Sequence, residues 1–326
     1  MKAIVQDEYG SPDVLELRDI DPPAITEDQV ILKVQAASLN PIDWHIMRGA
    51  PFLVRFTSGL RRPKPVVRGV DVAGQIEAVG ENVTRFQPGD EVFGTCAGSL
   101  AEYASAGQSR LVTRPARLSP TQAAAVPIAA FTALQGLRDL GRIEAGHRVL
   151  IIGASGGVGT FAVQIAKSFG AAVTGVCSAG NAELVRSIGA DDVIDYARGD
   201  FTKGSEAFDL IFQLAGTASP LSLRRILTPK GTLVLSSGMG RFAGIDRIVT
   251  ALVTSPFVGQ RLVTWVAKEN ADDLEFLAEL LESGKVTPVI DRTYPLDQAP
   301  EAIRYVEDGH TQGKVVVTVS APTGEG

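Results

Sequence analysis

The sequence predicts an α/β protein in which a β-rich domain accompanies a doubly wound parallel sheet. Up to about residue 120, short strand-like runs are broken by Gly, Pro and Asp, and from residue 121 to about 263 helical and strand-like patterns alternate. In residues 148–159 an apolar run ends in glycines spaced three apart, and a helical pattern follows. We therefore expect a β-rich substrate domain at 1–122, a sheet domain at 123–263, and a return to the first domain at 264–326.

The β-rich domain is predicted from its strand and turn signals. A strand pattern begins at the first residues, 66–79 is a strand broken by glycine, and Gln87-Pro88-Gly89-Asp90 is a turn. Near the end of the chain, 272–281 has the apolar spacing of an amphipathic helix, and 286–294 and 315–319 have strand patterns. These late strands are the reason to expect that the chain returns to the first domain.

The sheet domain is predicted from short apolar runs that alternate with helical patterns. Parallel strands buried on both faces have such runs, rich in β-branched residues. The expected strands are 149–152, 172–176, 193–194, 210–214 and 232–236.

The glycine turn after the first of these strands predicts a dinucleotide site. Gly153 would make the tight turn, Gly156 would admit a pyrophosphate close to the backbone, and Gly159 would let the helix pack against the strand. Apolar residues recur at helical spacing from 158 to 169, so the N-terminus of this helix would face the phosphates. The expected contacts are Gly153, Ala154, Ser155, Gly156, Gly157, Val158 and Gly159.

The end of the next strand favours NADPH over NADH as the cofactor. A binder of NAD usually places an acid there for the ribose hydroxyl, but the strand is followed by Ser178, Ala179, Gly180 and Asn181. Ser178 and Asn181 can donate hydrogen bonds to a 2′-phosphate, and Arg186 follows. The alternative is an ordinary polar loop in which Glu183 points outward or serves the ribose.

The amino-acid composition is typical of a soluble globular protein. The 326 residues are 45% hydrophobic and 21% charged, and the net charge of −6 gives no reason to expect nucleic acid or a membrane as a partner. One cationic stretch, 48–68, is either a solvated loop or a mouth for an anionic cofactor or substrate. Two cysteines cannot form a disulfide framework, and the immediate strand pattern leaves no room for a signal peptide. We expect a cytoplasmic protein.

Several motifs together resemble the medium-chain dehydrogenase/reductase superfamily, in its zinc-free quinone oxidoreductase branch. They are L-N-P-I-D at 39–43, G-V-D-V-A-G at 69–74, Q-P-G-D-E-V-F-G at 87–94, the glycine turn, and G-A-D-D-V-I-D-Y at 189–196. The resemblance covers nearly the whole chain. It implies that the β-rich domain is GroES-like and that the sheet domain is a Rossmann fold.

The resemblance also indicates that no metal is bound. Zinc-dependent members carry a catalytic Cys where this chain has Asn40, and a G-H-E triplet where it has Gly69-Val70-Asp71. Asn and Val do not rebuild a zinc site of sulfur and nitrogen ligands. Only Cys96 lies in the region of the structural zinc lobe, and the three histidines have no spacing suited to one metal site.

Further cofactor contacts are implied by the resemblance. Thr132 would contact the nicotinamide carboxamide, and Tyr196 would hold the 2′-phosphate together with Ser178 and Asn181. Lys314 would close over the cofactor from the other domain. The cofactor would also pass the strand ends at Leu214, Ala215, Ser236, Ser237 and Gly238. Members of the family commonly form homodimers, so we expect one here.

Without a metal, the expected reaction is hydride transfer from NADPH to a quinone or an α,β-unsaturated carbonyl in a cleft between the domains. Such acceptors spread the developing negative charge, whereas a simple carbonyl commonly needs zinc to polarise it. Asn40 would donate to the acceptor oxygen, and Asp43 would orient the loop or relay a proton; alternatively, both only shape the turn around Pro41. Two other functions stay open: a non-catalytic NADPH-binding redox sensor or scaffold, and an alcohol dehydrogenase-like carbonyl reductase with another metal arrangement.

Overall fold

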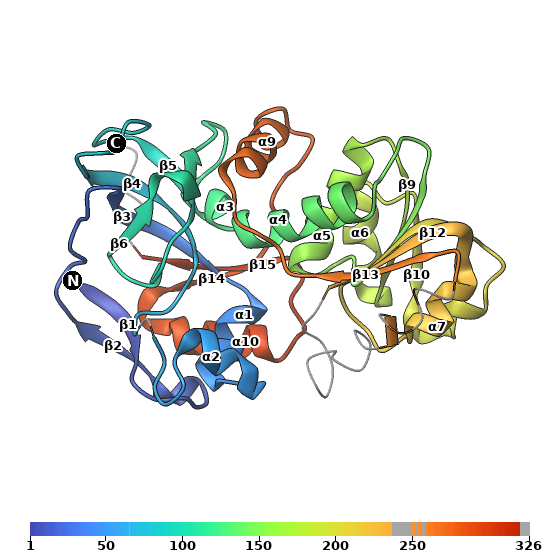
Figure 1. Ribbon diagram of the computed structural model, residues 1–326, viewed down its shortest axis with the longest axis horizontal. Helices are drawn as coiled ribbons and strands as arrows, with labels where there is room; N and C mark the ends of the chain where they lie inside the picture. The colour runs from blue at the N-terminus through green and yellow to red at the C-terminus, as the bar shows by residue number, and fades with distance from the viewer. Residues whose placement is uncertain (65, 237–249, 252, 254, 256–257, 320–326) are drawn as a thin grey trace. The chain divides into compact units, whose positions relative to one another are not determined.

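The computed structural model describes residues 1–64, 66–236, 250–251, 253, 255 and 258–319, and the chain forms two units (Figure 1). Unit 1 comprises Met1–Ala129, Glu269–Gly284 and Pro288–Gly326, and unit 2 comprises Ala130–Lys268 and Lys285–Thr287. The predicted mixed α/β class, with one β-rich part and one parallel sheet, is confirmed.

Unit 1 is built on a seven-stranded sheet in the order β14-β15-β3-β4-β5-β7, with β6 paired to β3 and a separate pair β1-β2. Its strands are β1 (Lys2–Gln6), β2 (Leu15–Asp19), β3 (Gln29–Leu39), β4 (Asp71–Val79), β5 (Glu91–Thr95), β6 (Tyr103–Gly107), β7 (Leu111–Thr113), β14 (Ile290–Pro295) and β15 (Lys314–Thr318). The late strand β15 pairs antiparallel with β3, so that Val315 lies opposite Leu39. The strand expected at 286–294 begins only at Ile290.

The helices assigned to this part of the chain are short. They are α1 (Pro41–Arg48), α2 (Arg55–Ser58), α3 (Pro120–Ala124), α4 (Pro127–Gln135), α9 (Ala271–Glu282) and α10 (Ala299–Glu307), of which α4 continues into unit 2. The amphipathic helix predicted at 272–281 is α9, and Asn270 caps it by accepting the Asp273 N–H at 2.8 Å.

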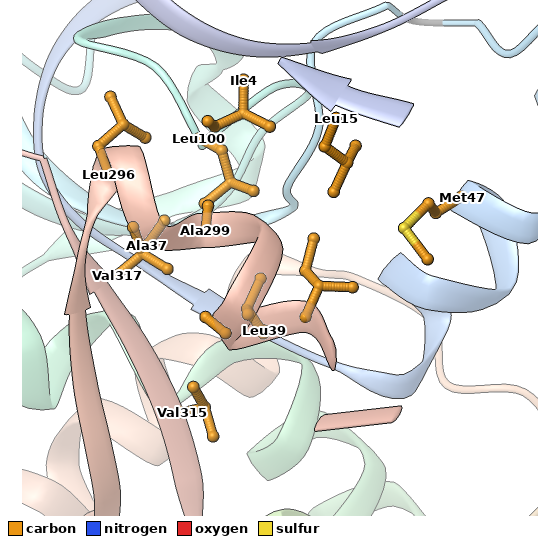
Figure 2. Close-up of a cluster of buried hydrophobic side chains, with 12 residues drawn as sticks. Ile4, Leu15, Ala37, Leu39, Met47, Leu100, Leu296, Ala299, Val315 and Val317 are labelled. Atoms are coloured by element: carbon orange, nitrogen blue, oxygen red, sulfur yellow. The ribbon is translucent and has the colours of Figure 1, made fainter. Parts of the chain in front are cut away.

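The core around β15, α1 and α10 holds α1 in place beside the sheet. Figure 2 shows Leu39 at the end of β3, Met47 on α1 and Ala299 on α10 among the buried side chains of this cluster. Met47 is fully buried, as are Ile4 and Leu100. Burial of a side chain of this size contributes about 1.5–3 kcal/mol, so α1 is fixed by packing as well as by its own hydrogen bonds.

Unit 2 contains a six-stranded sheet in which all neighbours are parallel, in the order β10-β9-β8-β11-β12-β13. The strands are β8 (Arg148–Ile152), β9 (Ala172–Cys177), β10 (Asp192–Asp195), β11 (Phe208–Gln213), β12 (Leu227–Ser236) and β13 (Arg261–Trp265). The five predicted strands are confirmed, and β13 was not predicted. The order reverses between β8 and β11, where open α/β sheets bind their ligands.

Three helices of unit 2 contact this sheet: α5 (Gly157–Ser168), α6 (Ala182–Ser187) and α7 (Pro220–Leu223).

The two cysteines are buried and free, as their number led us to expect. Among the described residues, no helix combines the length and apolar character needed to cross a bilayer.

Candidate functional site

The glycine turn after β8 has the backbone shape that a dinucleotide needs. Gly153 adopts a φ of +89°, which favours glycine, and a Cβ on Gly159 would lie 2.1 Å from the Gly153 carbonyl oxygen. A side chain at Gly159 would therefore push α5 away from β8. A Cβ on Gly156 would meet nothing nearer than 3.5 Å, so this backbone stays open to an approaching group.

The N-terminus of α5 offers donors to an anion. Gly156 is its N-cap and has no side chain with which to cap the first turn. The N–H groups of Gly157, Val158 and Gly159 belong to that first turn, where the helix dipole favours negative charge. This cradle fits a pyrophosphate, as the sequence predicted, although the individual contacts stay predictions.

Other residues expected to contact the cofactor at this end of the sheet lie next to the glycine turn. Asn181 donates to the Ser155 hydroxyl at 2.9 Å, so the loop after β9 is tied to the glycine turn. Across the switch point, the Leu214 N–H bonds the Ile152 carbonyl at 3.0 Å, and a Cβ on Gly153 would lie 2.7 Å from the Ala215 methyl. The ends of β8, β9 and β11 thus meet at one place.

Ser178 and Tyr196 also follow neighbouring strand ends, because Cys177 of β9 lies opposite Asp195 of β10. Burial raises the pKa of the Cys177 thiol, the Asp195 charge raises it further, and the Arg186 charge opposes both. Arg186 is therefore within electrostatic reach of the end of β9. The sequence analysis missed Asp195 as an acid near this end, but its carboxylate accepts the Ala197 N–H at 3.0 Å and lies 3.6 Å from the Arg198 guanidinium.

The remaining cofactor predictions fall on α4 and β12. Thr132 lies half-buried on α4, and Ser236 is the last residue of β12. Ser237 and Gly238 lie outside the described residues.

Unit 1 contains a buried charged cluster that joins four distant parts of the sequence. Asp71 at the start of β4 is fully buried, and its Oδ2 accepts bonds from the Ser38 hydroxyl at 2.8 Å and the Asn40 amide at 2.8 Å. The Lys314 ammonium of β15 lies 3.4 Å from the same oxygen. Asp71 Oδ1 accepts the Ile128 N–H at 3.1 Å, at the beginning of α4. Four donors therefore balance this buried carboxylate.

Lys314 is 3% exposed, and its ammonium has a full set of partners within this cluster. Besides Asp71, it bonds the Asn40 Oδ1 at 2.6 Å and the Leu39 carbonyl at 3.1 Å. An ammonium has three N–H donors, so none is left over. Burial lowers the pKa of Lys314, while the Asp71 and Asp43 charges oppose that shift. The predicted contact of Lys314 with the cofactor stays a prediction, and it requires the loss of one of these three bonds.

The same contacts determine how the Asn40 amide is oriented. Its oxygen faces the Lys314 ammonium, and its nitrogen faces the Asp71 carboxylate. The reverse orientation would place like groups together, so the network excludes an amide flip. An amide nitrogen has two N–H groups, and within the described part of the chain only the bond to Asp71 uses one of them. The second Asn40 N–H has no partner among the described residues, and the residue is 4% exposed.

Asp43 is the third residue of α1, one turn after the N-cap residue Asn40. Its Oδ2 accepts the Asn40 backbone N–H at 2.8 Å, so Asp43 shapes the helix start around Pro41, a role that the sequence left open. The side chain is buried, and burial raises its pKa from 3.8 to about 7. The Asp71 charge adds to that rise, while the Asn40 N–H and the charges of Lys314 and Arg68 oppose it. At neutral pH, Asp43 can therefore hold and release a proton.

Sequence reasoning missed Asp71 and Arg68 as members of this cluster. Arg68 is 4% exposed, its Nε and one Nη have no partner among the described residues, and burial lowers its pKa while the Asp43 charge opposes this. A signal was present, because both charged residues stand in an apolar strand-like stretch, V-V-R-G-V-D-V-A. Charged residues in such stretches are buried only when other groups compensate them.

His45 contacts residues of its own loop through one ring nitrogen, and its Nε2 has no partner among the described residues. Its Nδ1 is 2.8 Å from the Ala50 carbonyl oxygen, and its ring stacks on Trp44 with a centroid separation of 3.6 Å. Among the described residues, no three His, Cys, Asp or Glu side chains are grouped as metal ligands.

Comparison with known proteins identifies the family. Residues 26–116 match the alcohol dehydrogenase GroES-like domain, and residues 188–317 match the family described as zinc-binding dehydrogenase. The mitochondrial NAD(P)H oxidoreductase RTN4IP1 of Bos taurus is 35% identical over 98% of this chain and 89% of its own. The chain belongs to the medium-chain dehydrogenase/reductase superfamily and is quinone oxidoreductase-like.

Two further relatives agree with this assignment. The chloroplastic NADPH-dependent alkenal/one oxidoreductase of Arabidopsis thaliana is 36% identical, over 97% of this chain and 79% of its own. The structure of the quinone oxidoreductase from Coxiella burnetii superposes with a TM-score of 0.87 at 30% identity, and the match covers 98% of this chain and 99% of that one. The chain is therefore an oxidoreductase that uses a nicotinamide cofactor on a small-molecule substrate.

Proposed function

We propose that this oxidoreductase uses NADPH to reduce a quinone or an α,β-unsaturated carbonyl without zinc. The observation that carries the proposal is the Asn40 amide, which Lys314 and Asp71 hold so that one N–H stays available beside the buried Asp43. The relatives named as quinone and alkenal/one oxidoreductases support this substrate class. Membership of an oxidoreductase family argues against the non-catalytic alternative.

The preference for NADPH is supported by the groups at the ends of β9 and β10. Ser178 and Tyr196 follow paired strand positions, Asn181 is tied to the glycine turn, and Arg186 is within electrostatic reach. These groups suit a 2′-phosphate, which needs donors and positive charge. The acid at this end, Asp195, already accepts the Ala197 N–H and lies 3.6 Å from Arg198.

Operation without zinc is supported by the residues at the positions that bind zinc in other members. Asn40 and Val70 stand there, and the Lys314 ammonium already bonds the Asn40 oxygen and Asp71. A dication at this place would be repelled by the ammonium, and it would lack thiolate and imidazole ligands. Elemental analysis of the purified protein should therefore show far less than one zinc per chain, and about one zinc that survives chelation would refute this part of the proposal.

The chemistry follows from what this chain can donate. Bound NADPH supplies the hydride. The free N–H of Asn40 stabilises negative charge that develops on the acceptor oxygen, and the Lys314 and Asp71 contacts keep it aligned. Asp43 donates the proton that completes the reduction, directly or through water, because its raised pKa leaves it partly protonated at neutral pH. A conjugated acceptor delocalises its charge, so hydrogen bonds suffice where a simple ketone commonly needs a metal.

The test is Asn40→Ala, assayed by NADPH oxidation with a panel of quinones, enones and simple alcohols or ketones. We expect turnover with the best conjugated acceptor to fall by about ten- to a thousandfold while NADPH affinity is unchanged. Asn82→Ala is the matched control, since Asn82 is exposed and outside the cluster. Thermal unfolding checks that each variant is folded.

Unchanged turnover of a folded Asn40→Ala protein would reduce Asn40 to a residue that shapes the loop. Failure of every conjugated acceptor with the unaltered protein would refute the proposed substrate class. The homodimer and the cytoplasmic setting stay predictions, which gel filtration and cell fractionation can test.

A further inference from the structure

A cationic segment interrupts an otherwise acidic chain. Residues 44–70 contain six Arg and Lys residues and no Asp or Glu, whereas the whole chain has a net charge of −6. Arg48 of this segment is paired with Glu307, and Arg68 is buried. Arg61, Arg62 and Lys64 are exposed and have no ion pair within the described residues. These three side chains present positive charge to the solvent.

The same segment exposes four large apolar side chains. Phe52, Leu53, Phe56 and Leu60 are between 56% and 64% exposed, and they lie on the 3₁₀ turn Phe52–Val54, on α2, and just after α2. Single exposed apolar residues are ordinary on a protein surface. Four within nine residues form a group, and such groups mark interaction surfaces.

Tyr9 and Arg55 hold the helical turn that carries this group in place. The Tyr9 hydroxyl donates to the Ser58 carbonyl at 2.9 Å, and the Arg55 guanidinium lies 4.4 Å from the centre of the Tyr9 ring. Arg55 Nε also donates to the Gly49 carbonyl at 3.0 Å. The rings of Phe52 and Phe56 are 5.8 Å apart and edge to face, and both are more than half exposed, while the Arg55 guanidinium lies 5.6 Å from the centre of the Phe52 ring.

We propose that this patch, the four apolar residues together with Arg61, Arg62 and Lys64, binds the surface of a bilayer that contains anionic lipids. Apolar side chains on a short amphipathic element enter the boundary between headgroups and acyl chains, while neighbouring cations contact the anionic headgroups. An anionic bilayer complements both halves of the patch. The acid Asp7, close in sequence to Tyr9, is already paired with Arg18.

A bilayer partner differs from the expectation, drawn from the net charge, that no membrane is a partner. The mean charge of the chain matters less than its distribution, since electrostatic attraction to a membrane surface acts over about one Debye length, roughly 10 Å. The inference concerns attachment to a surface and involves no spanning segment. It stands independently of the proposed reaction, because its measurement requires neither NADPH nor an acceptor.

The test is cosedimentation of the full chain with vesicles of phosphatidylcholine alone and of phosphatidylcholine mixed with phosphatidylglycerol. We expect binding to the mixed vesicles, weakened by salt, and little binding to phosphatidylcholine alone. The triple variant Arg61→Gln, Arg62→Gln, Lys64→Gln should bind the mixed vesicles at least about tenfold more weakly, since each cation near an anionic surface contributes roughly fivefold. Phe52→Ser with Phe56→Ser should also weaken binding.

Matched controls separate this patch from general charge and hydrophobicity. Lys33→Gln, Lys230→Gln and Lys285→Gln together remove the same charge from exposed positions elsewhere, and Val266→Ser removes an apolar side chain that is 77% exposed. Both should bind as the unaltered chain does. Equal loss in the controls, or no preference for anionic vesicles, would overturn the proposal. If the patch variants instead convert a dimer into a monomer and the unaltered chain ignores vesicles, the patch serves self-association and the proposal is wrong.

Discussion

Replacement of Asp43 by Asn should remove a distinct pH dependence from the stability of this protein. Burial raises the pKa of the folded Asp43 carboxyl to about 7, whereas an unfolded chain titrates it near 3.8. Between these values the unfolded chain releases the proton and the folded chain keeps it, so the free energy of unfolding falls as the pH rises. The stability contribution is complete below about pH 4 and is lost above about pH 7.

The magnitude follows from the gap between the two values. From about pH 5 to about pH 8, the free energy of unfolding should fall by about 2.5 kcal/mol more in the unaltered protein than in Asp43→Asn. The Asn oxygen can still accept the Asn40 N–H, so the start of α1 keeps its hydrogen bond. Urea unfolding at both pH values measures the difference, and Asp28→Asn, at an exposed carboxylate, is the control.

Activity provides a second readout for Asp43. If Asp43 supplies the proton, turnover with a conjugated acceptor should fall as the pH rises through about 7, and Asp43→Asn should be slow at every pH. Parallel stability curves for the two proteins would refute the raised pKa. If the stability of the two proteins differs with pH as expected but the pH profile of turnover is unchanged in Asp43→Asn, Asp43 is a structural carboxyl only.

Three further outcomes are expected. Lys314→Met should destabilise the protein by about 3–5 kcal/mol in denaturant unfolding, because it leaves the buried Asp71 carboxylate without its cation, and a loss below about 1 kcal/mol would contradict the ion pair. Gly159→Ala should abolish NADPH binding or folding, because its Cβ would lie 2.1 Å from a backbone oxygen. As the control, Gly180→Ala should bind NADPH with unchanged affinity in a titration, because a Cβ there would meet nothing within 4 Å. Ser178→Asp should weaken NADPH binding by about 1–3 kcal/mol relative to NADH, and equal Michaelis constants for the two cofactors in the unaltered protein would remove the reason for that expectation.

Local patterns in the sequence were sufficient to predict the parallel sheet and its glycine turn. Strands such as β8 and β11 are short buried apolar runs, and the turn between β8 and α5 depends on residues within about ten positions of one another. The strand β13 was missed because Arg261–Trp265 is only partly buried and carries polar residues, so it lacks that apolar run. The start of β14 was placed four residues too early, because residues 286–289 are mostly apolar but the strand pairs with β15 only from Ile290 onward.

The sequence also located the loop from Asn40 to Asp43, but only the tertiary structure decided what these residues can do. The free N–H of Asn40 depends on Lys314 and Asp71, which are 274 and 31 positions away in the sequence, and on the pairing of β15 and β4 with β3. The raised pKa of Asp43 depends on burial and on charges from β4, β15 and Arg68. A local pattern determines which backbone shape forms. The protonation state and free donors of a buried group are determined by every charge that the fold brings near it, because low-dielectric surroundings make those interactions strong.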